Sequence, residues 1–114
     1  ILKHDRKAFV DQLSFITSVG HLDGGDARAR AKLPGKGPTA VITDLGILTP
    51  DPVTKELTLT SLHPGATAEQ AVAATGWPLK VAPQVAVTPA PEPHELEALR
   101  ALLRRTNEAH GRAA

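Results

Sequence analysis

The sequence predicts an α/β fold, either a single domain or a fragment of one, in which short strands form part of an open sheet with helices beside it. Residues 38–49 form a short apolar run rich in β-branched side chains, which is typical of a buried strand. Thr67 and Gln70 have the spacing of a helix capping box. Residues 92–110 place leucines along one face of a longer helix. We expect the sheet to continue beyond these 114 residues.

Composition excludes several classes of function. The chain has no cysteine, which excludes disulfides, thiolate zinc sites and a cysteine nucleophile. A formal net charge of +1 and only three aromatic side chains argue against a nucleic-acid partner. No apolar run approaches the roughly 18 residues of a membrane span, and the charged first residues do not fit a signal peptide. We therefore expect a cytoplasmic location and no membrane partner.

The first 37 residues are expected to form one helix, one strand and a long loop. Asp5 is suited to cap a short helix over residues 5–13, with Phe9 on its buried stripe. Residues 15–17 are a candidate strand. Residues 19–37 contain five glycines and no periodicity, which predicts a loop. Loops of this length are usually functional or held by a partner.

The central strand over residues 38–49 is interrupted by Asp44. An unpaired charge in a core is costly, so Asp44 either ends the buried part or has a specific partner. Residues 50–52 have the composition of a turn and precede a second strand at residues 57–62, which predicts an antiparallel hairpin with a long loop. His63, followed by Pro-Gly, ends that strand.

The rest of the chain is predicted as helix, strand, strap and helix. The helix that begins after Thr67 is expected to end at Gly76 in a left-handed conformation. Residues 79–82 form another strand of the same sheet. Four prolines in residues 83–93 favour an extended strap, which leads into the final helix.

Three familiar kinds of catalytic or binding motif are incomplete. Residues 34–39 resemble a phosphate-binding loop, but Arg30 stands where a glycine is required and a strand follows, which favours a tight turn before that strand. His21, Asp23 and Asp26 could bind a metal, yet they lack a further ligand on a regular element. The alternative is that the His21 ring bonds the backbone or touches a neighbouring subunit.

Hydrolase triads are equally weak, because the fold and not the local sequence places their members. The possible combinations draw on Ser14, Ser18, His21, Asp23, Asp44, Ser61 and His63. We expect His63 to bond the backbone at the end of its strand. None of the six glutamates has a context that suggests a nucleophile.

The loop also has a basic stretch. Arg28, Arg30 and Lys32 alternate with alanines. They could present a modest positive patch to an anionic ligand such as a phosphate-bearing cofactor. A solvated loop is the alternative.

Four stretches together resemble one family. They are Phe-Ile-Thr-Ser-Val-Gly-His-Leu-Asp-Gly-Gly (15–25), Leu-Pro-Gly-Lys-Gly-Pro-Thr-Ala-Val-Ile-Thr-Asp-Leu-Gly (33–46), Leu-Thr-Ser-Leu-His-Pro-Gly (59–65) and Ala-Thr-Gly-Trp-Pro-Leu (74–79). In this order they resemble the C-terminal half of the β subunit of class I CoA-transferases, in the glutaconate CoA-transferase branch. The departures at Val19 and at Ile47 and Leu48 look like packing changes.

The resemblance implies a portion of an open, doubly wound CoA-transferase-type sheet with flanking helices. It implies coenzyme A as a substrate and no permanently bound cofactor. The implied partners are a separate α subunit in a hetero-oligomer, an acyl-CoA and a carboxylic acid. Family members carry CoA as a thioester on a glutamate of the upstream half, so no catalytic residue is assigned here. The loop residues Gly20, His21, Gly24 and Gly25 are the expected contacts to CoA.

Two other functions remain open. Some relatives in this branch lack the nucleophile and hydrolyse carbon–carbon bonds of cyclic acyl-CoA compounds, which would make this chain part of a ring-opening hydrolase. A non-catalytic interaction module would bind a partner through its strap and final helix. That function requires the chain to fold alone without an exposed sheet edge.

Overall fold

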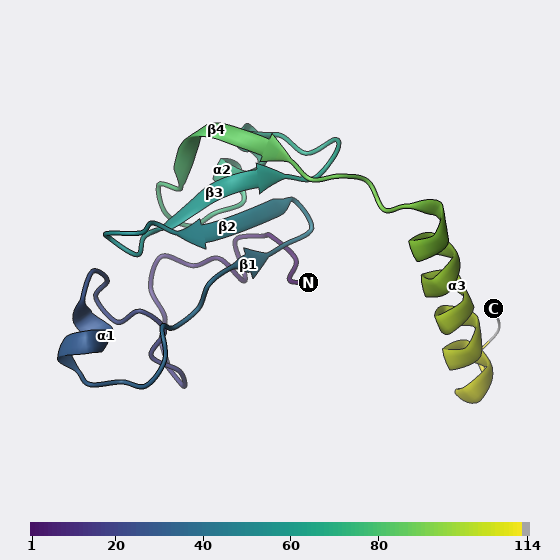
Figure 1. Cartoon of the computed structure of the whole chain (residues 1–114), viewed down its shortest axis with the longest axis horizontal. Coiled ribbons are helices and arrows are strands. Elements are labelled where there is room, and N and C mark those ends of the chain that lie inside the picture. Colours follow the sequence, from purple (N-terminus) through teal and green to yellow (C-terminus); the bar gives the residue numbers. More distant parts are fainter. Residues whose placement is uncertain (113–114) are drawn as a thin grey trace.

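A computed structural model describes residues 1–112, which contain one four-stranded sheet and three helices (Figure 1). The strands are β1 (Val41–Ile42), β2 (Gly46–Pro50), β3 (Leu57–Leu62) and β4 (Lys80–Val87), and the helices are α1 (Ala27–Arg30), α2 (Ala68–Ala73) and α3 (Pro93–Ala109). The strand order is β1-β2-β3-β4, with β1, β2 and β3 antiparallel and β3 and β4 parallel. The predicted α/β class and open sheet are confirmed.

The predicted single strand over residues 38–49 is wrong, because it is a hairpin of β1 and β2. The Thr43 hydroxyl oxygen accepts the N–H groups of Leu45 and Gly46, each at 3.1 Å. Those two bonds close a tight turn in the middle of the apolar run. Asp44 lies in this turn and ends β1, and its carboxylate accepts a backbone N–H at 2.7 Å.

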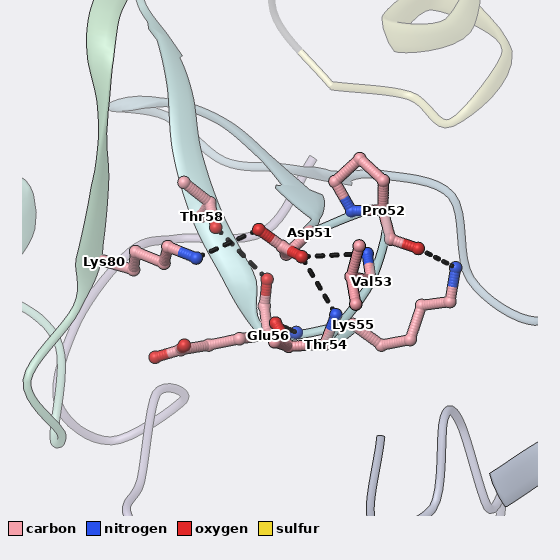
Figure 2. Close-up of polar contacts among 8 residues, drawn as sticks. All are labelled: Asp51, Pro52, Val53, Thr54, Lys55, Glu56, Thr58 and Lys80. Atoms are coloured by element: carbon pink, nitrogen blue, oxygen red, sulfur yellow. Dashed lines mark hydrogen bonds and ion pairs between the residues drawn. The ribbon is translucent and has the colours of Figure 1, made fainter. Parts of the chain in front are cut away.

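The predicted hairpin of β2 and β3 is confirmed, and Asp51 organises its loop (Figure 2). The Asp51 carboxylate accepts the N–H groups of Val53 and Thr54 at 2.8 and 2.9 Å. It also accepts a bond from the Lys80 ammonium on β4 at 2.9 Å. The Thr54 amide, followed by the Lys80 ammonium, lowers the pKa of Asp51. The loop is thereby tied to the edge strand.

The core lies between the sheet and α2. Leu48, Leu59 and Ala71 are fully buried, and Leu79 is nearly so. The predicted capping box is present, since the Thr67 hydroxyl accepts the Gln70 N–H and the Gln70 side chain accepts the Thr67 N–H. This cap begins α2 where its Ala71 can cover β2 and β3.

The end of α2 differs from the prediction. The helix is capped by Ala74, and Gly76 does not adopt a positive φ. Gly76 is instead needed for close approach, because a Cβ there would lie 2.5 Å from the Phe9 carbonyl oxygen. That oxygen accepts the Gly76 N–H at 2.7 Å.

The N-terminal helix predicted over residues 5–13 is only one turn, held by the Asp5 carboxylate. A longer helix would use the Phe9 carbonyl for its own ladder, but Gly76 takes that acceptor. The predicted strand at residues 15–17 is also wrong, because that segment forms no strand in the structure. Its Phe15 side chain is 79% exposed.

The strand predicted at residues 79–82 returns to the sheet as expected but continues to Val87. It therefore includes Pro83, which the sequence predicts to lie in the strap over residues 83–93. Proline is tolerated here because β4 is an edge strand with an irregular register opposite Leu59 and Ser61. The extended segment is confined to residues 88–92.

Helix α3 lies away from the sheet at the end of that segment (Figure 1). None of its residues is buried, and Leu99, Leu102 and Leu103 are each 51% exposed. The radius of gyration is 17.5 Å, against about 13 Å for a compact domain of this length. The accessible surface is 8568 Å², against about 6000 Å² expected for this mass. The chain thus exposes much more surface than a compact domain. Within residues 1–112, no helix is both long and apolar enough to cross a membrane.

Candidate functional site

The glycine-rich loop lies against the loop between β2 and β3. The Gly25 N–H donates to the Thr54 carbonyl oxygen at 2.9 Å. Gly24 has a φ of +88°, and a Cβ there would collide with the same oxygen. Gly24 is therefore required for the close approach of the two loops, since any side chain there would separate them. Gly25 has room for a Cβ, and its glycine is favoured by a φ of +55°.

His21 bonds the backbone, as the alternative to a metal site predicted. Its Nε2 donates to the Pro38 carbonyl oxygen at 2.8 Å, which leaves Nδ1 without a proton in the neutral ring. The ring also lies against Gly37, where a Cβ would come within 2.8 Å of it. Among residues 1–112 no group of three or more metal-ligating side chains is assembled, so the metal hypothesis for His21, Asp23 and Asp26 finds no support.

His63 also makes the predicted backbone bond. Its Nε2 donates to the Thr43 carbonyl oxygen at 2.9 Å, and its Nδ1 accepts the Thr88 hydroxyl at 2.7 Å. Both ring nitrogens are therefore used in joining the β1–β2 turn to the end of β4. This arrangement suits a structural residue and not a general base.

Two of the three cations in the predicted patch, Arg28 and Arg30, bond within the loop. The Arg28 guanidinium donates to the carbonyl oxygens of Gly20 and Pro34 at 2.6 and 2.7 Å, so it closes the loop from inside. Arg30 pairs with Asp26 at 2.8 Å, and both side chains are largely exposed. The Arg28 Nε is buried and has no hydrogen-bond partner among the described residues.

Two neighbouring cavities lie between the loop and the β2–β3 connection. The first has a volume of about 330 Å³ and is lined by His21, Gly25, Asp26, Arg28, Ala29, Leu33, Gly35, Lys36 and Lys55. The second, of about 240 Å³, is lined by His21, Lys36, Pro38, Thr39, Pro50 and Lys55. We call the region that they share the lysine cleft, defined by His21, Lys36 and Lys55. Of the expected contacts, His21 lines both cavities and Gly25 lines only the first. Gly20 and Gly24 line neither and contribute backbone hydrogen bonds to Arg28 and His21.

A third cavity of about 230 Å³ lies over β2, β3 and β4. Threonine and proline side chains line most of it, and the Asp51–Lys80 ion pair closes one side. Because the two charges neutralise each other, this cavity has no net attraction for an anion.

Sequence reasoning missed the most buried ionisable side chain among the described residues, His4, which is 5% exposed. Its Nε2 donates to the Thr75 hydroxyl at 2.8 Å, because that hydroxyl gives its own proton to a backbone carbonyl. Its Nδ1 lies 3.2 Å from the Thr43 hydroxyl, and its ring stacks on Phe9 at 4.1 Å. Burial lowers the pKa of His4, so the ring is neutral and joins the N-terminal segment to the sheet.

The fold and the cleft define a member of the α/β class with an open sheet and a basic surface site. The chain belongs to the coenzyme A transferase family, which matches residues 1–74. It is 57% identical over 111 residues to the β subunit of 3-oxoadipate CoA-transferase of Pseudomonas knackmussii, covering 97% of this chain and 43% of that protein. The family resemblance predicted from sequence is confirmed.

Glutaconate CoA-transferase of Acidaminococcus fermentans is similar in sequence and in structure. Its β subunit is 35% identical over 101 residues, covering 88% of this chain and 38% of that subunit. Its crystal structure matches with a TM-score of 0.77 and 33% identity, covering 86% of this chain and 38% of the matched chain. The present chain thus spans less than half the length of each relative.

Proposed function

We propose that this chain is part of the β subunit of a CoA-transferase that moves CoA between an acyl-CoA and a dicarboxylic acid such as 3-oxoadipate. The observation that carries this proposal is the 57% identity to the β subunit of 3-oxoadipate CoA-transferase across 97% of the chain. The second relative is named for glutaconate, which is also a dicarboxylate. The proposal requires no permanently bound cofactor.

The proposed reaction proceeds through a glutamate that lies outside these 114 residues. Its carboxylate attacks the acyl-CoA thioester and expels the CoA thiolate, which forms a mixed anhydride. The thiolate then attacks the glutamyl carbonyl, so the acid leaves and a glutamyl-CoA thioester remains. The acceptor acid reverses both steps. Backbone N–H groups stabilise the oxyanions.

The exposure of the glutamates in this chain supports a nucleophile that lies outside these 114 residues. All six are exposed, and they are Glu56, Glu69, Glu92, Glu95, Glu97 and Glu108. An anhydride formed on an exposed carboxylate would be open to hydrolysis by water, so a transferase needs a shielded nucleophile. In this proposal the loop with Gly20, His21, Gly24 and Gly25 contacts CoA or the partner.

The large exposed surface supports assembly with a separate α subunit. The accessible area of 8568 Å² includes the exposed leucines of α3 and the exposed Phe15. Apolar surface of this extent is typical of proteins that are covered by a partner or by further chain. We therefore propose a hetero-oligomer in which this segment supplies structure and contacts.

The test uses the full-length β subunit purified with the α subunit that accompanies it. The complex is incubated with an acyl-CoA and with 3-oxoadipate or glutaconate, and acetate serves as the control acceptor. Chromatography with mass detection should show a new dicarboxylyl-CoA and the released donor acid. Addition of one water to a cyclic acyl-CoA, with its thioester intact and no CoA transferred, would favour the ring-opening hydrolase, and no reaction would refute the transferase proposal.

A further inference from the structure

Two lysines from separate segments line the same cleft. Lys36 comes from the glycine-rich loop and Lys55 from the loop between β2 and β3, and both line the two neighbouring cavities. Within residues 1–112 the ion pairs involve Arg30, Lys80 and His94. Neither cleft lysine therefore has a carboxylate partner in the described part of the chain.

The backbone fixes both lysines at the cleft. Lys36 lies between Gly35 and Gly37, whose φ angles are +72° and +81°, values that glycine adopts at little cost. Lys55 has a φ of +65°, and its N–H donates to the Asp51 carbonyl oxygen at 3.0 Å. A lysine at a positive φ is uncommon. The Lys55 ammonium donates one hydrogen bond to the Pro52 carbonyl oxygen at 2.9 Å, so two of its three N–H groups remain for a ligand.

The cleft carries a net positive charge. Arg28 adds a third cation to the lining of the first cavity, held in place by two carbonyl oxygens. The lining contains one carboxylate, Asp26, which is already bonded to Arg30. The second cavity has no acidic side chain in its lining. Concave surfaces with charges of one sign concentrate ions of the opposite sign.

We propose that the lysine cleft binds a phosphate group, with the ammonium groups of Lys36 and Lys55 on its oxygens. Lysines bind phosphate as point charges, and two of them on opposite loops can hold one anion between them. The identity of this phosphate rests on the proposed function: it is one of the phosphate groups of CoA. A cavity of about 330 Å³ is at the low end for small-molecule sites, so it holds only a part of CoA.

The experiment compares Lys36→Gln, Lys55→Gln and the double variant in the full-length complex, with Lys7→Gln as the control. Lys7 is exposed on the N-terminal turn and lines neither cavity. Each cleft variant should raise the KM for acyl-CoA about tenfold, the loss expected for one hydrogen bond to a charged group, with kcat unchanged. Added salt should reduce the difference in KM between wild type and the cleft variants, because it screens the attraction between lysine and phosphate. Lys7→Gln should leave both constants unchanged.

Calorimetry with ADP and with inorganic phosphate gives a readout that does not depend on activity. Binding of inorganic phosphate, and of ADP where the diphosphate is the group that the cleft holds, should weaken in both cleft variants and not in Lys7→Gln. Acyl-dephospho-CoA, which lacks the 3′-phosphate, shows which phosphate the cleft binds. If the cleft variants raise its KM as much as they raise the KM for acyl-CoA, the cleft binds the diphosphate. If they leave its KM unchanged, the cleft binds the 3′-phosphate. Unchanged KM and unchanged ADP binding in the double variant would overturn the proposal. Lysine-dependent ADP or inorganic phosphate binding in a complex that transfers no CoA would keep the phosphate site and refute the proposed function.

Discussion

The Gly25 N–H donates to the Thr54 carbonyl oxygen at 2.9 Å, and this bond joins the glycine-rich loop to the β2–β3 connection. The contact brings Lys36 and Lys55 to a shared cleft, although they are distant in sequence. The residues that make the site are thus placed by backbone contacts between two loops. The predictions that follow test those contacts and the core beneath them.

Gly24→Ala should weaken the junction of the two loops. The new Cβ would collide with the Thr54 carbonyl oxygen, and alanine is strained at a φ of +88°. We expect a loss of about 2–4 kcal/mol in the free energy of unfolding, together with a raised KM for acyl-CoA. Urea unfolding and steady-state kinetics on the full-length complex measure the two effects.

Gly35→Ala is the matched control for that variant. Gly35 has a similar φ of +72°, but a Cβ there meets no atom within 4 Å. It should cost only the left-handed strain, about 1–2 kcal/mol. Equal losses in the two variants would show that the Thr54 contact contributes nothing.

Asp51 should stabilise the β2–β3 loop at neutral pH and lose that effect in acid. The Thr54 amide and the Lys80 ammonium lower its pKa from the ordinary value of 3.8. A lowered folded-state pKa means that the contribution is present above pH 3.8 and disappears as the pH falls through the folded value. Unfolding of wild type and Asp51→Ala should therefore differ at neutral pH and converge in strong acid.

Asp51→Asn separates the two kinds of contact at this residue. An amide oxygen can still accept the Val53 and Thr54 N–H groups, but the ion pair with Lys80 is lost. We expect a stability between those of wild type and Asp51→Ala. If Asp51→Asn matches Asp51→Ala at neutral pH, the turn bonds carry no stability.

His4 should make the fold sensitive to mild acid. Burial lowers its pKa below the ordinary 6.5, so below that pH the unfolded chain binds more protons than the folded one. The free energy of unfolding should decline as the pH falls below 6.5 and level off below the folded-state pKa. His4→Gln should be less stable at neutral pH but lack this decline, which urea titrations across the range would detect. An identical pH dependence in both proteins would contradict the buried neutral ring.

Leu59→Ala should be the most damaging of the simple truncations. Leu59 is 0% exposed on β3 and packs against Leu48 beneath α2. Removing a buried leucine costs about 2–5 kcal/mol through lost burial and the cavity that remains. The free energy of unfolding measures this loss, and Val53→Ala, at a side chain 77% exposed, is the control. Equal losses would refute the assigned core.

Local sequence signals predicted the elements that local interactions build. The Thr67–Gln70 capping box begins α2, and the turn residues between β2 and β3 form the expected loop. The sequence predicts one strand over residues 38–49 because apolar side chains flank Asp44 on both sides and no Pro or Asn-Gly pair marks a turn there. The signal that could have shown the hairpin is the Thr-Asp-Leu-Gly sequence at 43–46, where the threonine hydroxyl closes the turn.

Long-range contacts account for what could not be predicted. His4 bonds Thr43 and Thr75, which are 39 and 71 residues away in the sequence. The residues around His4 therefore do not indicate either partner. The first helix ends early because Gly76 takes the Phe9 carbonyl. The CoA contacts expected at the loop glycines stay a prediction. The pairing of Lys36 with Lys55 could not be predicted, because only the fold brings the two lysines together.

The most direct test of the central claim is to locate the covalent CoA thioester. The full-length complex is incubated with acyl-CoA, treated with borohydride to reduce the enzyme-bound thioester, and digested for mass spectrometry. The account predicts one modified glutamate in the β subunit, outside residues 1–114. Modification of a glutamate within these residues, or turnover of acyl-CoA with no modified glutamate anywhere in the complex, would contradict it.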